Sequence, residues 1–576
     1  MQLIRLYSNK TSFHTVNFKP GVNFIVGSAT KQNKSNTKKT YNGVGKSLLI
    51  KLIDFCLACE AVPEFSEKLD GWEFTLEFET GGQKYISTRS TSKQQRITLN
   101  GEEMSTDVFR DTFLGKVFGI TEPINFLTWR SLITRFLRPR KESYVHFDTT
   151  SSKETPYSKL INTAYLLGLD IELIQKKKDL KTELDRIETM KTSLENDEIF
   201  KKYFTQDKEV DIEIVDLEDK IKNLKNLLDA FQVSESYYEI QQEADKLKYD
   251  GQQIKNRITL LQNSINQIDK TIEIRSDITP GTIIDLYSEA KQHLQKAVVK
   301  TLNEVTDFHI ALMSERKKRL LSEKEQLLSE VKKLEKRRKE TGDQLDERLK
   351  FLGKHKALDE FVAINTKLSD LNISLEKLKS YKGLLQEYQN KTDEIGISFS
   401  EENIKTNHYL TEVSSLVEKN INTFRLFSKR FYDDKAGGIE VKQNKGINQV
   451  RFDINVQIDD DTSDGVNEVK IFCFDMTLLL TRHNHSVRFI LHDSRLYSNI
   501  DPRQRATLFR LCDEYSASEK FQYIATVNED QIESVREHYS EDEYKKIIEN
   551  NRILNLTDES EESRLLGVHL NIDYEK

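Results

Sequence analysis

The stretch Asn42-Gly43-Val44-Gly45-Lys46-Ser47 decides the fold of this chain, and it is followed directly by the apolar run LLIKLIDF (residues 48–55). Glycines let backbone N–H groups crowd around phosphate oxygens, a lysine at this position reaches the β and γ phosphates, and a serine ligates Mg²⁺. The preceding run VNFIVG (22–27) reads as a buried strand and the following run as a helix. We therefore expect a phosphate-binding loop for ATP and Mg²⁺ built from Gly27, Asn42, Gly43, Gly45, Lys46 and Ser47.

A lysine-rich insert, SATKQNKSNTKKTY (28–41), separates the end of this strand from the loop glycines. The strict spacing of a phosphate loop is therefore not kept. Because the N–H groups come from the glycines next to the helix, an insert at the tip still leaves a phosphate site possible. The insert is either a solvated loop or a contact to phosphate through Lys31, Lys34, Lys38 and Lys39.

A second strand-like run, SVRFILHD (486–493), ends on a carboxylate far along the chain. A phosphate loop needs an acidic residue that orients Mg²⁺, and Asp493 at the end of a buried strand fits that role. We expect Ser47 and Asp493 to hold the metal together. The two ends of the chain would then share one site.

The segment between these motifs is depleted in residues that interrupt helices. Pro280 is the only proline between Tyr157 and Asp501, and apolar residues recur at alternating steps of three and four. Such spacing keeps an apolar stripe against a partner helix and predicts a coiled coil. The spacing is seen in Leu173, Leu180, Ile187 and Leu194, in Ile214 to Leu228, in Ile254 to Ile268 and in Ile364 to Leu378.

Pro280-Gly281 offers a turn, so we expect two antiparallel arms with a reversal near residues 272–300. A continuous arm of roughly 100 residues would reach at most about 150 Å at ~1.5 Å per residue. The alternative is a helical bundle folded back on itself. The expected domains are residues 1–167 with the phosphate loop, the coil at 168–395, and a C-terminal part at 396–576.

Composition excludes several classes of protein. The chain has 576 residues, 31% of them charged, and a net charge of −7, which argues against a globally basic nucleic-acid binder. No apolar run approaches the ~20 residues of a membrane span, and the first residues, MQLIRLYSNK, lack the long apolar segment expected of a secretory signal. Cys56 and Cys59 lie in an apolar helix-like run, which favours packing over metal or redox chemistry. We expect a cytoplasmic protein with no membrane contact.

The order of phosphate loop, long coil and C-terminal half-site resembles the SMC-like ABC ATPases, the group that includes SMC proteins and RecN. The resemblance covers almost the whole chain and implies an α/β ABC-type ATPase head assembled from the N- and C-terminal segments, with a long antiparallel coiled coil between them. Several stretches look closer still to a bacterial subgroup of SMC-like ATPases from three-component anti-phage conflict loci. These are INFLTWRSLITRFLR, the Phe308-His309 pair, SDGVNEVKIFCFDMTLLL, FILHDSRLYSNIDPRQ, QYIATVNED and LTDESEESRLLG.

The resemblance assigns roles to further residues. Ser463 and Gly465 in Ser463-Asp464-Gly465 stand where the ABC signature would bind the γ phosphate held by the opposite subunit. Asn499-Ile500-Asp501 stands at the D-loop position, and Asn528 at the switch position, where the family has histidine.

Two departures concern hydrolysis. Ser494 follows Asp493, where an active ABC ATPase has the glutamate that polarises water, and no glutamine occurs between Gln95 and Gln175 to serve as the Q-loop. Arg130 or Arg135 could substitute for that glutamine. Loss of a general base removes about 10²–10⁴-fold in rate, so we expect slow hydrolysis. The residues that could compensate are His492, Asp501 and Glu468.

The resemblance implies an ATP-dependent homodimer joined through its heads, acting on DNA as a sensor or motor in anti-phage defence, with an effector or accessory protein from the same operon. An alternative is a nucleotide-gated scaffold with weak or no hydrolysis that controls a separate effector. A third is a DNA repair or chromosome factor, although the coil has no CxxC near its reversal for a zinc hook.

Overall fold

The computed structural model describes residues 1–28, 43–196, 210–229, 238–273, 302–352, 357–459 and 465–568. The chain divides into two compact units, each described by itself. The sheet unit contains Met1–Lys181 and Ser398–Lys576, and the helical unit contains Thr182–Ser288 and Val299–Ile397. The predicted boundaries after residues 167 and 395 stay predictions, and the structure places the divisions after residues 181 and 397.

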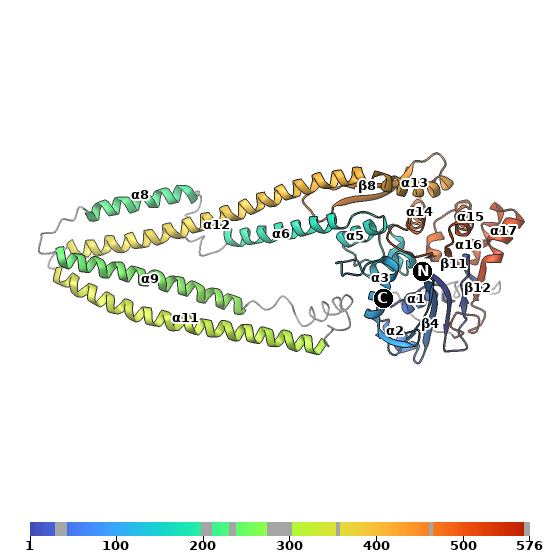
Figure 1. Ribbon diagram of the computed structural model, residues 1–576, viewed down its shortest axis with the longest axis horizontal. Coiled ribbons are helices and arrows are strands. Elements are labelled where there is room, and N and C mark those ends of the chain that lie inside the picture. Colours follow the sequence, from blue (N-terminus) through green and yellow to red (C-terminus); the bar gives the residue numbers. More distant parts are fainter. Residues whose placement is uncertain are drawn as a thin grey trace. The chain divides into compact units, whose positions relative to one another are not determined.

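A four-stranded parallel sheet in the sheet unit combines strands from both ends of the chain (Figure 1). Its order is β10-β11-β3-β12, with bounds Phe489–His492, Gln522–Asn528, Gly21–Ser28 and Arg552–Thr557. Every neighbouring pair is parallel. The α/β class is thus confirmed, and this sheet is assembled from N- and C-terminal segments as expected.

A six-stranded antiparallel sheet is formed by the N-terminal segment alone, in the order β2-β1-β4-β5-β6-β7. The bounds are Val16–Asn17, Gln2–Ser8, Glu73–Thr80, Gln83–Ser90, Arg96–Leu99 and Glu102–Ser105. The Gly81-Gly82 turn joins β4 to β5 and Asn100-Gly101 joins β6 to β7, with positive φ at all four residues. Positive φ at both central residues is what a type I′ turn, one of the two common two-residue hairpin turns, requires.

Helix α1 (Lys46–Cys56) packs against strands of both sheets. Leu49, Leu52, Ile53 and Phe55 are fully buried, so the helix is apolar over most of its surface. The buried Arg89 guanidinium of β5 lies 4.3 Å from the centre of the Phe55 ring and donates to the Phe55 carbonyl. The helix that begins at the phosphate loop is therefore fixed on both sides.

The remaining elements of the sheet unit surround these sheets. The N-terminal part adds α2 (Pro63–Lys68), α3 (Thr106–Phe118), α4 (Trp129–Leu137), the 3₁₀ turn η2 (Lys141–Tyr144) and α5 (Pro156–Leu166). The C-terminal part adds α13 (Ser414–Phe431), the antiparallel hairpin β8 (Gly437–Gln443) and β9 (Phe452–Ile458), α14 (Val466–Thr481), η4 (Ser494–Tyr497), α15 (Pro502–Glu519), α16 (Glu529–Glu533), η5 (Arg536–His538), α17 (Glu541–Ile547) and η6 (Glu549–Asn551).

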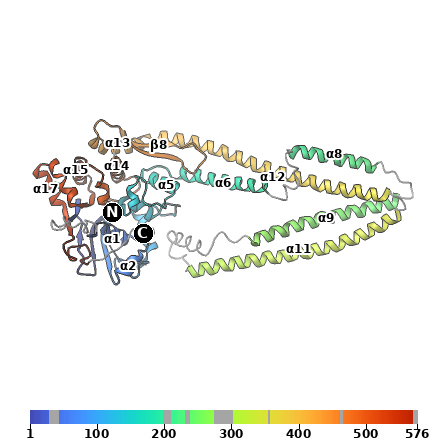
Figure 2. The same ribbon diagram turned by 180° about the vertical axis from the view of Figure 1, so that it is seen from behind.

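The helical unit contains α8 (Val210–Asp229), α9 (Tyr238–Glu273), α11 (Leu302–Leu352), and parts of α6 (Glu172–Glu195) and α12 (Ala357–Glu412). Helices α9 and α11 lie side by side in both views (Figures 1 and 2). Ion pairs join Arg348 to Glu243, Arg257 to Glu330, and Lys324 to Asp269, so the two helices are antiparallel. The heptad positions Ile254, Ile258, Leu261, Ile265 and Ile268 are all buried, which confirms that stripe.

The relative directions of α8, α9 and α12 contradict the prediction of two continuous antiparallel arms. Glu218 of α8 pairs with Lys379 of α12, and Asp211 with Lys382, so α8 and α12 are antiparallel. On α9, Gln252 bonds to Ser369 and Lys255 pairs with Asp370, and Lys248 reaches Asn365, so α9 and α12 are parallel.

The chain therefore reverses between α8 and α9 and between α11 and α12, as well as between α9 and α11. The alternative of a bundle folded back on itself describes this unit, in which α12 contacts both α8 and α9, and α9 also packs against α11. Pro280 lies outside the described residues.

Within the described part of the chain, no helix has the length and apolar character to cross a membrane.

Replacing Leu261 by alanine should weaken the α9–α11 pair by about 2–4 kcal/mol, because it empties a buried position. The neighbouring Leu260 is 60% exposed, and its alanine variant should change stability by less than about 0.5 kcal/mol. Hydrogen exchange of α9 peptides in the full chain measures the change in stability for each of the two variants. Equal effects of the two variants would contradict the packing described.

Candidate nucleotide-binding site

The phosphate loop meets α1 through two glycines with left-handed backbone. Gly43 has φ 101° and Gly45 φ 107°, conformations that residues with a Cβ rarely adopt. Gly45 is the N-cap of α1, so the first helical turn begins at Lys46, and the N–H groups of a first turn have no carbonyl partner within their own helix. The arrangement offers a set of N–H donors to an anion at this helix end. Asn42 lies outside the described residues.

Leu565, in the C-terminal segment, contacts the loop at Val44 and Gly45. The Leu565 N–H donates to the Val44 carbonyl at 3.1 Å. A Cβ placed on Gly45 would lie 2.5 Å from Leu565 Cβ, so only glycine fits at this point. The stretch that contains Leu565 is therefore part of the loop's structure, although it lies far from the loop in sequence.

The Lys46 side chain is 94% buried and lies over the end of β3. A Cβ on Gly27 would collide with Lys46 Nζ, so the absence of a side chain at Gly27 makes room for the lysine. Burial lowers the pKa of the Lys46 ammonium, and the Asp493 and Asp530 carboxylates oppose this effect. The two carboxylates therefore act on the same ammonium group.

Ser47 and Asp493 meet directly. The Ser47 hydroxyl donates to Asp493 Oδ2 at 2.9 Å, and the Asp493 side chain is almost fully buried. Thr526 of β11 also donates to Oδ2, at 3.3 Å. Both predicted metal ligands thus face each other at the carboxyl ends of the parallel strands, where ligands bind in open α/β sheets.

The other side of Asp493 is held by backbone and side-chain groups. Its N–H donates to the Tyr144 hydroxyl at 2.7 Å. Its Oδ1 accepts from Ser494 Oγ at 3.3 Å and from the Arg495 N–H at 3.2 Å. Ser494 therefore supports the Asp493 carboxylate and carries no carboxylate of its own.

Asn528 stands beside the phosphate-loop strand. It pairs with Gly27 in the parallel register of β11 and β3 and forms the N-cap of α16. Its N–H donates to Gln531 Oε1 at 2.9 Å, and Gln531 Nε2 donates to the Ser494 carbonyl at 3.0 Å. The buried Gln531 amide thus joins the switch position to the residue that follows Asp493.

His492 points away from this site. Its Nε2–H donates to Asp475 Oδ2 at 2.9 Å, and its Nδ1 lies 3.0 Å from the Tyr523 hydroxyl. Asp475 also forms an ion pair with Arg138, and the side chains of His492, Asp475 and Arg138 are all buried. Burial lowers the pKa of His492, so the imidazole is neutral in the folded chain. When the pH falls below the usual histidine pKa of about 6.5, the unfolded chain binds a proton here that the folded chain does not, and unfolding is favoured. We assign His492 to this buried network and not to the attacking water.

Asp501 and Glu468 also have other partners. Asp501 caps α15 by accepting the Gln504 N–H at 2.9 Å. Glu468, in the first turn of α14, accepts from Asn499 Nδ2 at 2.6 Å. Gly465 has φ 89°, and a Cβ there would lie 2.6 Å from the Asn499 carbonyl oxygen, so the expected signature and D-loop positions are in contact. Ser463 lies outside the described residues.

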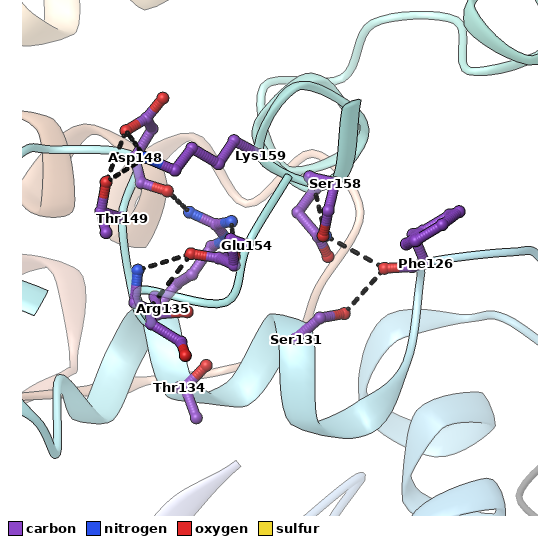
Figure 3. A network of polar contacts seen from close by, with 12 residues as sticks. Phe126, Ser131, Thr134, Arg135, Asp148, Thr149, Glu154, Ser158 and Lys159 are labelled. Carbon is purple, nitrogen blue, oxygen red and sulfur yellow. Dashed lines mark hydrogen bonds and ion pairs between the residues drawn. The ribbon is translucent and has the colours of Figure 1, made fainter. Parts of the chain in front are cut away.

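The two arginines considered as Q-loop substitutes form internal ion pairs. Arg130 Nη2 lies 2.6 Å from Asp54 Oδ1, in α1. Arg135 donates to the Glu154 carboxylate at 2.8 Å and to the Asp148 carbonyl, as Figure 3 shows. Arg135 is therefore occupied in anchoring the loop between η2 and α5.

The four cysteines are all free and buried. Burial raises the pKa of Cys59, which lies in the expected CxxC pair. Within the residues that the structure describes, no group of three His, Cys, Asp or Glu side chains could hold a metal ion.

Four residues of the site were not found from the sequence: Tyr144, Thr526, Asp530 and Gln531. Thr526 could have been found, because residues two apart on a strand share a face and Asn528 was already placed at the site. Gln531 stands at N3 after Asn528, the capping-box position. Tyr144 has no such local signal.

The residues present fit Mg²⁺–ATP. A lysine, a pair of left-handed glycines and a serine–aspartate pair converge on one helix N-terminus. Hydroxyl and carboxylate oxygens are the ligands that Mg²⁺ prefers, with phosphate oxygens and water completing its shell.

A family model described as "Uncharacterised protein conserved in bacteria (DUF2326)" matches residues 427–570, which is less than half of the chain. No curated protein matches the chain. The matching solved structures include the Smc head domain with a coiled coil and joint from Pyrococcus yayanosii, at 13% identity and a TM-score of 0.36, covering 96% of this chain and 94% of that one.

They also include the Smc head domain with an extended coiled coil bound to the C-terminal domain of ScpA from Pyrococcus furiosus. This structure has 10% identity and a TM-score of 0.31, and the match covers 92% of this chain and 91% of that one. Both TM-scores are below 0.5, so we base the function of this chain on its own residues.

Replacing Asp475 by asparagine should lower the stability of the sheet unit by about 3–5 kcal/mol, because Arg138 would become an uncompensated buried charge. Arg536→Gln is the control, since its pair with Glu541 is exposed and should contribute less than about 1 kcal/mol. Denaturant unfolding measures both. Unchanged stability with lost ATP hydrolysis would instead give the His492–Asp475 pair a catalytic role.

Proposed function

We propose that this chain binds ATP with Mg²⁺ at the site between α1 and the ends of β3, β10 and β11. The observation that carries the proposal is the 2.9 Å hydrogen bond from Ser47 Oγ to Asp493 Oδ2. A serine directly after the phosphate-loop lysine and a carboxylate at the end of a parallel strand are the two protein ligands of such a metal. Their meeting requires both ends of the chain.

Each residue has a role in binding. The N–H groups at Gly45 and in the first turn of α1 bind phosphate oxygens, and Lys46 swings from its place over Gly27 to the β and γ phosphates. Ser47 and Asp493 hold Mg²⁺, and Thr526 and Tyr144 keep Asp493 in place. When bound, the metal neutralises charge that develops on the transferred phosphoryl group.

Hydrolysis is proposed to be slow. Ser494 provides a hydroxyl that bonds to Asp493, whereas His492, Asp501 and Glu468 each bond elsewhere. The remaining candidate base is Asp530, whose carboxylate acts electrostatically on Lys46 together with Asp493. This set of residues supports tight nucleotide binding more than rapid turnover.

On the resemblance to SMC-like ABC ATPases, we extend the proposal to a cytoplasmic homodimer joined around nucleotide. Gly465, at the N-terminus of the 16-residue helix α14, would face the phosphate held by the second copy. DNA association, anti-phage defence and an operon-encoded effector belong to the same extension.

The scaffold alternative, in which nucleotide binding controls a separate effector, is favoured by the hydroxyl at Ser494. Strong DNA-stimulated turnover would support the motor, whereas a copurifying partner with little stimulation would support the scaffold.

Ser47→Ala and Asp493→Asn should each weaken Mg²⁺–ATP binding by about 10-fold or more, because each removes a metal ligand. EDTA should weaken binding to the unmodified chain by a similar factor and should have little effect on the variants. Ser518→Ala, at an exposed serine of α15, is the matched control. Titration calorimetry measures the affinities, and metal-independent binding by the unmodified chain would contradict the site.

Ser494→Glu should raise the single-turnover rate of ATP hydrolysis by about 10-fold or more, because it supplies a carboxylate beside Asp493. Ser494→Gln has a similar shape without the charge and should leave the rate low. If both variants hydrolyse ATP at the original rate, the hydroxyl at position 494 is not what limits turnover.

A further inference from the structure

A partly open cavity of about 360 Å³ lies on the helical unit, where α9, α11 and α12 meet. It is lined by residues of all three helices, among them Lys248, Gly251, Gly342, Phe361, Asn365 and Ser369. The volume falls within the range of small-molecule sites. The cavity lies beyond Ile254, the first residue of the tightly packed α9–α11 stripe.

Asn365 gives the cavity an unused hydrogen-bond donor. Its side chain is 92% buried, and its Oδ1 accepts from Lys248 Nζ. Its Nδ2 has no hydrogen-bond partner. A buried donor without an acceptor costs about 1–3 kcal/mol, so an acceptor that enters the cavity would recover this free energy.

Lys248 adds a positive charge at the same place. Burial lowers the pKa of its ammonium, opposed by the Asp245 carboxylate on the same helix. The Nζ atom also lies 5.5 Å from the centre of the Phe361 ring. An anion beside Nζ would offset the desolvation of this ammonium, which a neutral ligand cannot do.

The other charged residues of the lining are of both signs. Lys255 lines the cavity and pairs with Asp370 at 3.5 Å, so its charge is compensated. Arg338 and Asp346 line it from α11. Lys248, whose Nζ donates to Asn365, is therefore the cation on which binding of an anionic ligand depends.

Gln252, Thr341, Thr366 and Ser369 are polar residues of the lining, and the remaining part of the wall is apolar. It is formed by Leu247, Leu345, Leu349, Phe361 and Val362. Gly342 leaves space that a side chain would fill, because a Cβ placed there meets no atom within 4 Å. A glycine inside a helix costs about 1 kcal/mol relative to alanine, so the open space comes at a loss of helix stability.

We propose that this cavity binds a small amphiphilic carboxylate. Its carboxylate accepts hydrogen bonds from Asn365 Nδ2 and Lys248 Nζ, and its apolar body lies against the leucines and Phe361. The site belongs wholly to the helical unit and does not depend on the nucleotide site.

Calorimetric titration of the full chain with decanoate tests the proposal. Decanoate should bind. Decan-1-ol has the same chain without the charge, and its affinity should be lower by about 10-fold or more. Gly342→Leu fills the cavity while favouring helix and should reduce decanoate affinity by about 10-fold or more. Asn365→Leu removes the unpaired donor and should reduce it as well.

Gly383→Leu is the matched control, because Gly383 lies in α12 outside the cavity lining and also has open space around it. Its affinity for decanoate should equal that of the unmodified chain. Circular dichroism verifies that each variant keeps its helix content. Absence of decanoate binding, or equal binding by all variants, would overturn the proposal.

Discussion

The parallel pairing of β3 with β11 is the constraint on which the sheet unit depends. It runs in register from Gly21 opposite Gln522 to Gly27 opposite Asn528, and β12 pairs with the other edge of β3. Backbone hydrogen bonds buried in this sheet have no water to replace them, so neither end of the chain can leave without exposing unpaired groups. The sheet therefore fixes the two ends of the chain to each other before any ligand binds.

The same pairing creates the chemistry of the site. The carboxyl ends of parallel strands lie on one edge, so the pairing places Gly27 and Asn528 next to each other and brings Asp493 of the next strand to Ser47. Gln531 then joins the segments after β10 and β11 through its two hydrogen bonds. A single amide side chain thus connects the Asn528 N–H to the Ser494 carbonyl, directly after Asp493.

Local patterns in the sequence predicted the glycine-rich loop before α1 and the buried strand that leads to Asp493, because each depends on residues close together in the chain. The choice of His492 as a catalytic residue ignored the alternation of side chains along a strand. Neighbours on a strand point to opposite faces, and His492 bonds to Asp475 and Tyr523 whereas Asp493 bonds to Ser47. The supporting contacts of Leu565 and Tyr144 come from distant segments and have no local signal.

The helical unit shows a second limit of prediction from the sequence, which concerns the pairing of helices. Heptad spacing identified the buried face of α9 correctly, but it carries no information about which helix covers that face or in which direction. A long interval with Pro280 as its only proline was therefore interpreted as two extended arms, whereas the ion pairs and hydrogen bonds show α9 antiparallel to α11 and parallel to α12. The polar residues at the meeting of these three helices, Lys248 and Asn365 among them, were not part of any heptad argument.

The central claim is that one Mg²⁺–ATP site is formed by the two ends of this chain. A double-mutant cycle on Ser47→Ala and Asp493→Asn, with Mg²⁺–ATP affinity measured in the presence and absence of the metal, tests it most directly. The account predicts that the double variant binds no more weakly than the more damaged single variant, and that this coupling disappears without Mg²⁺. Additive losses, or coupling that persists without the metal, would contradict a shared metal site.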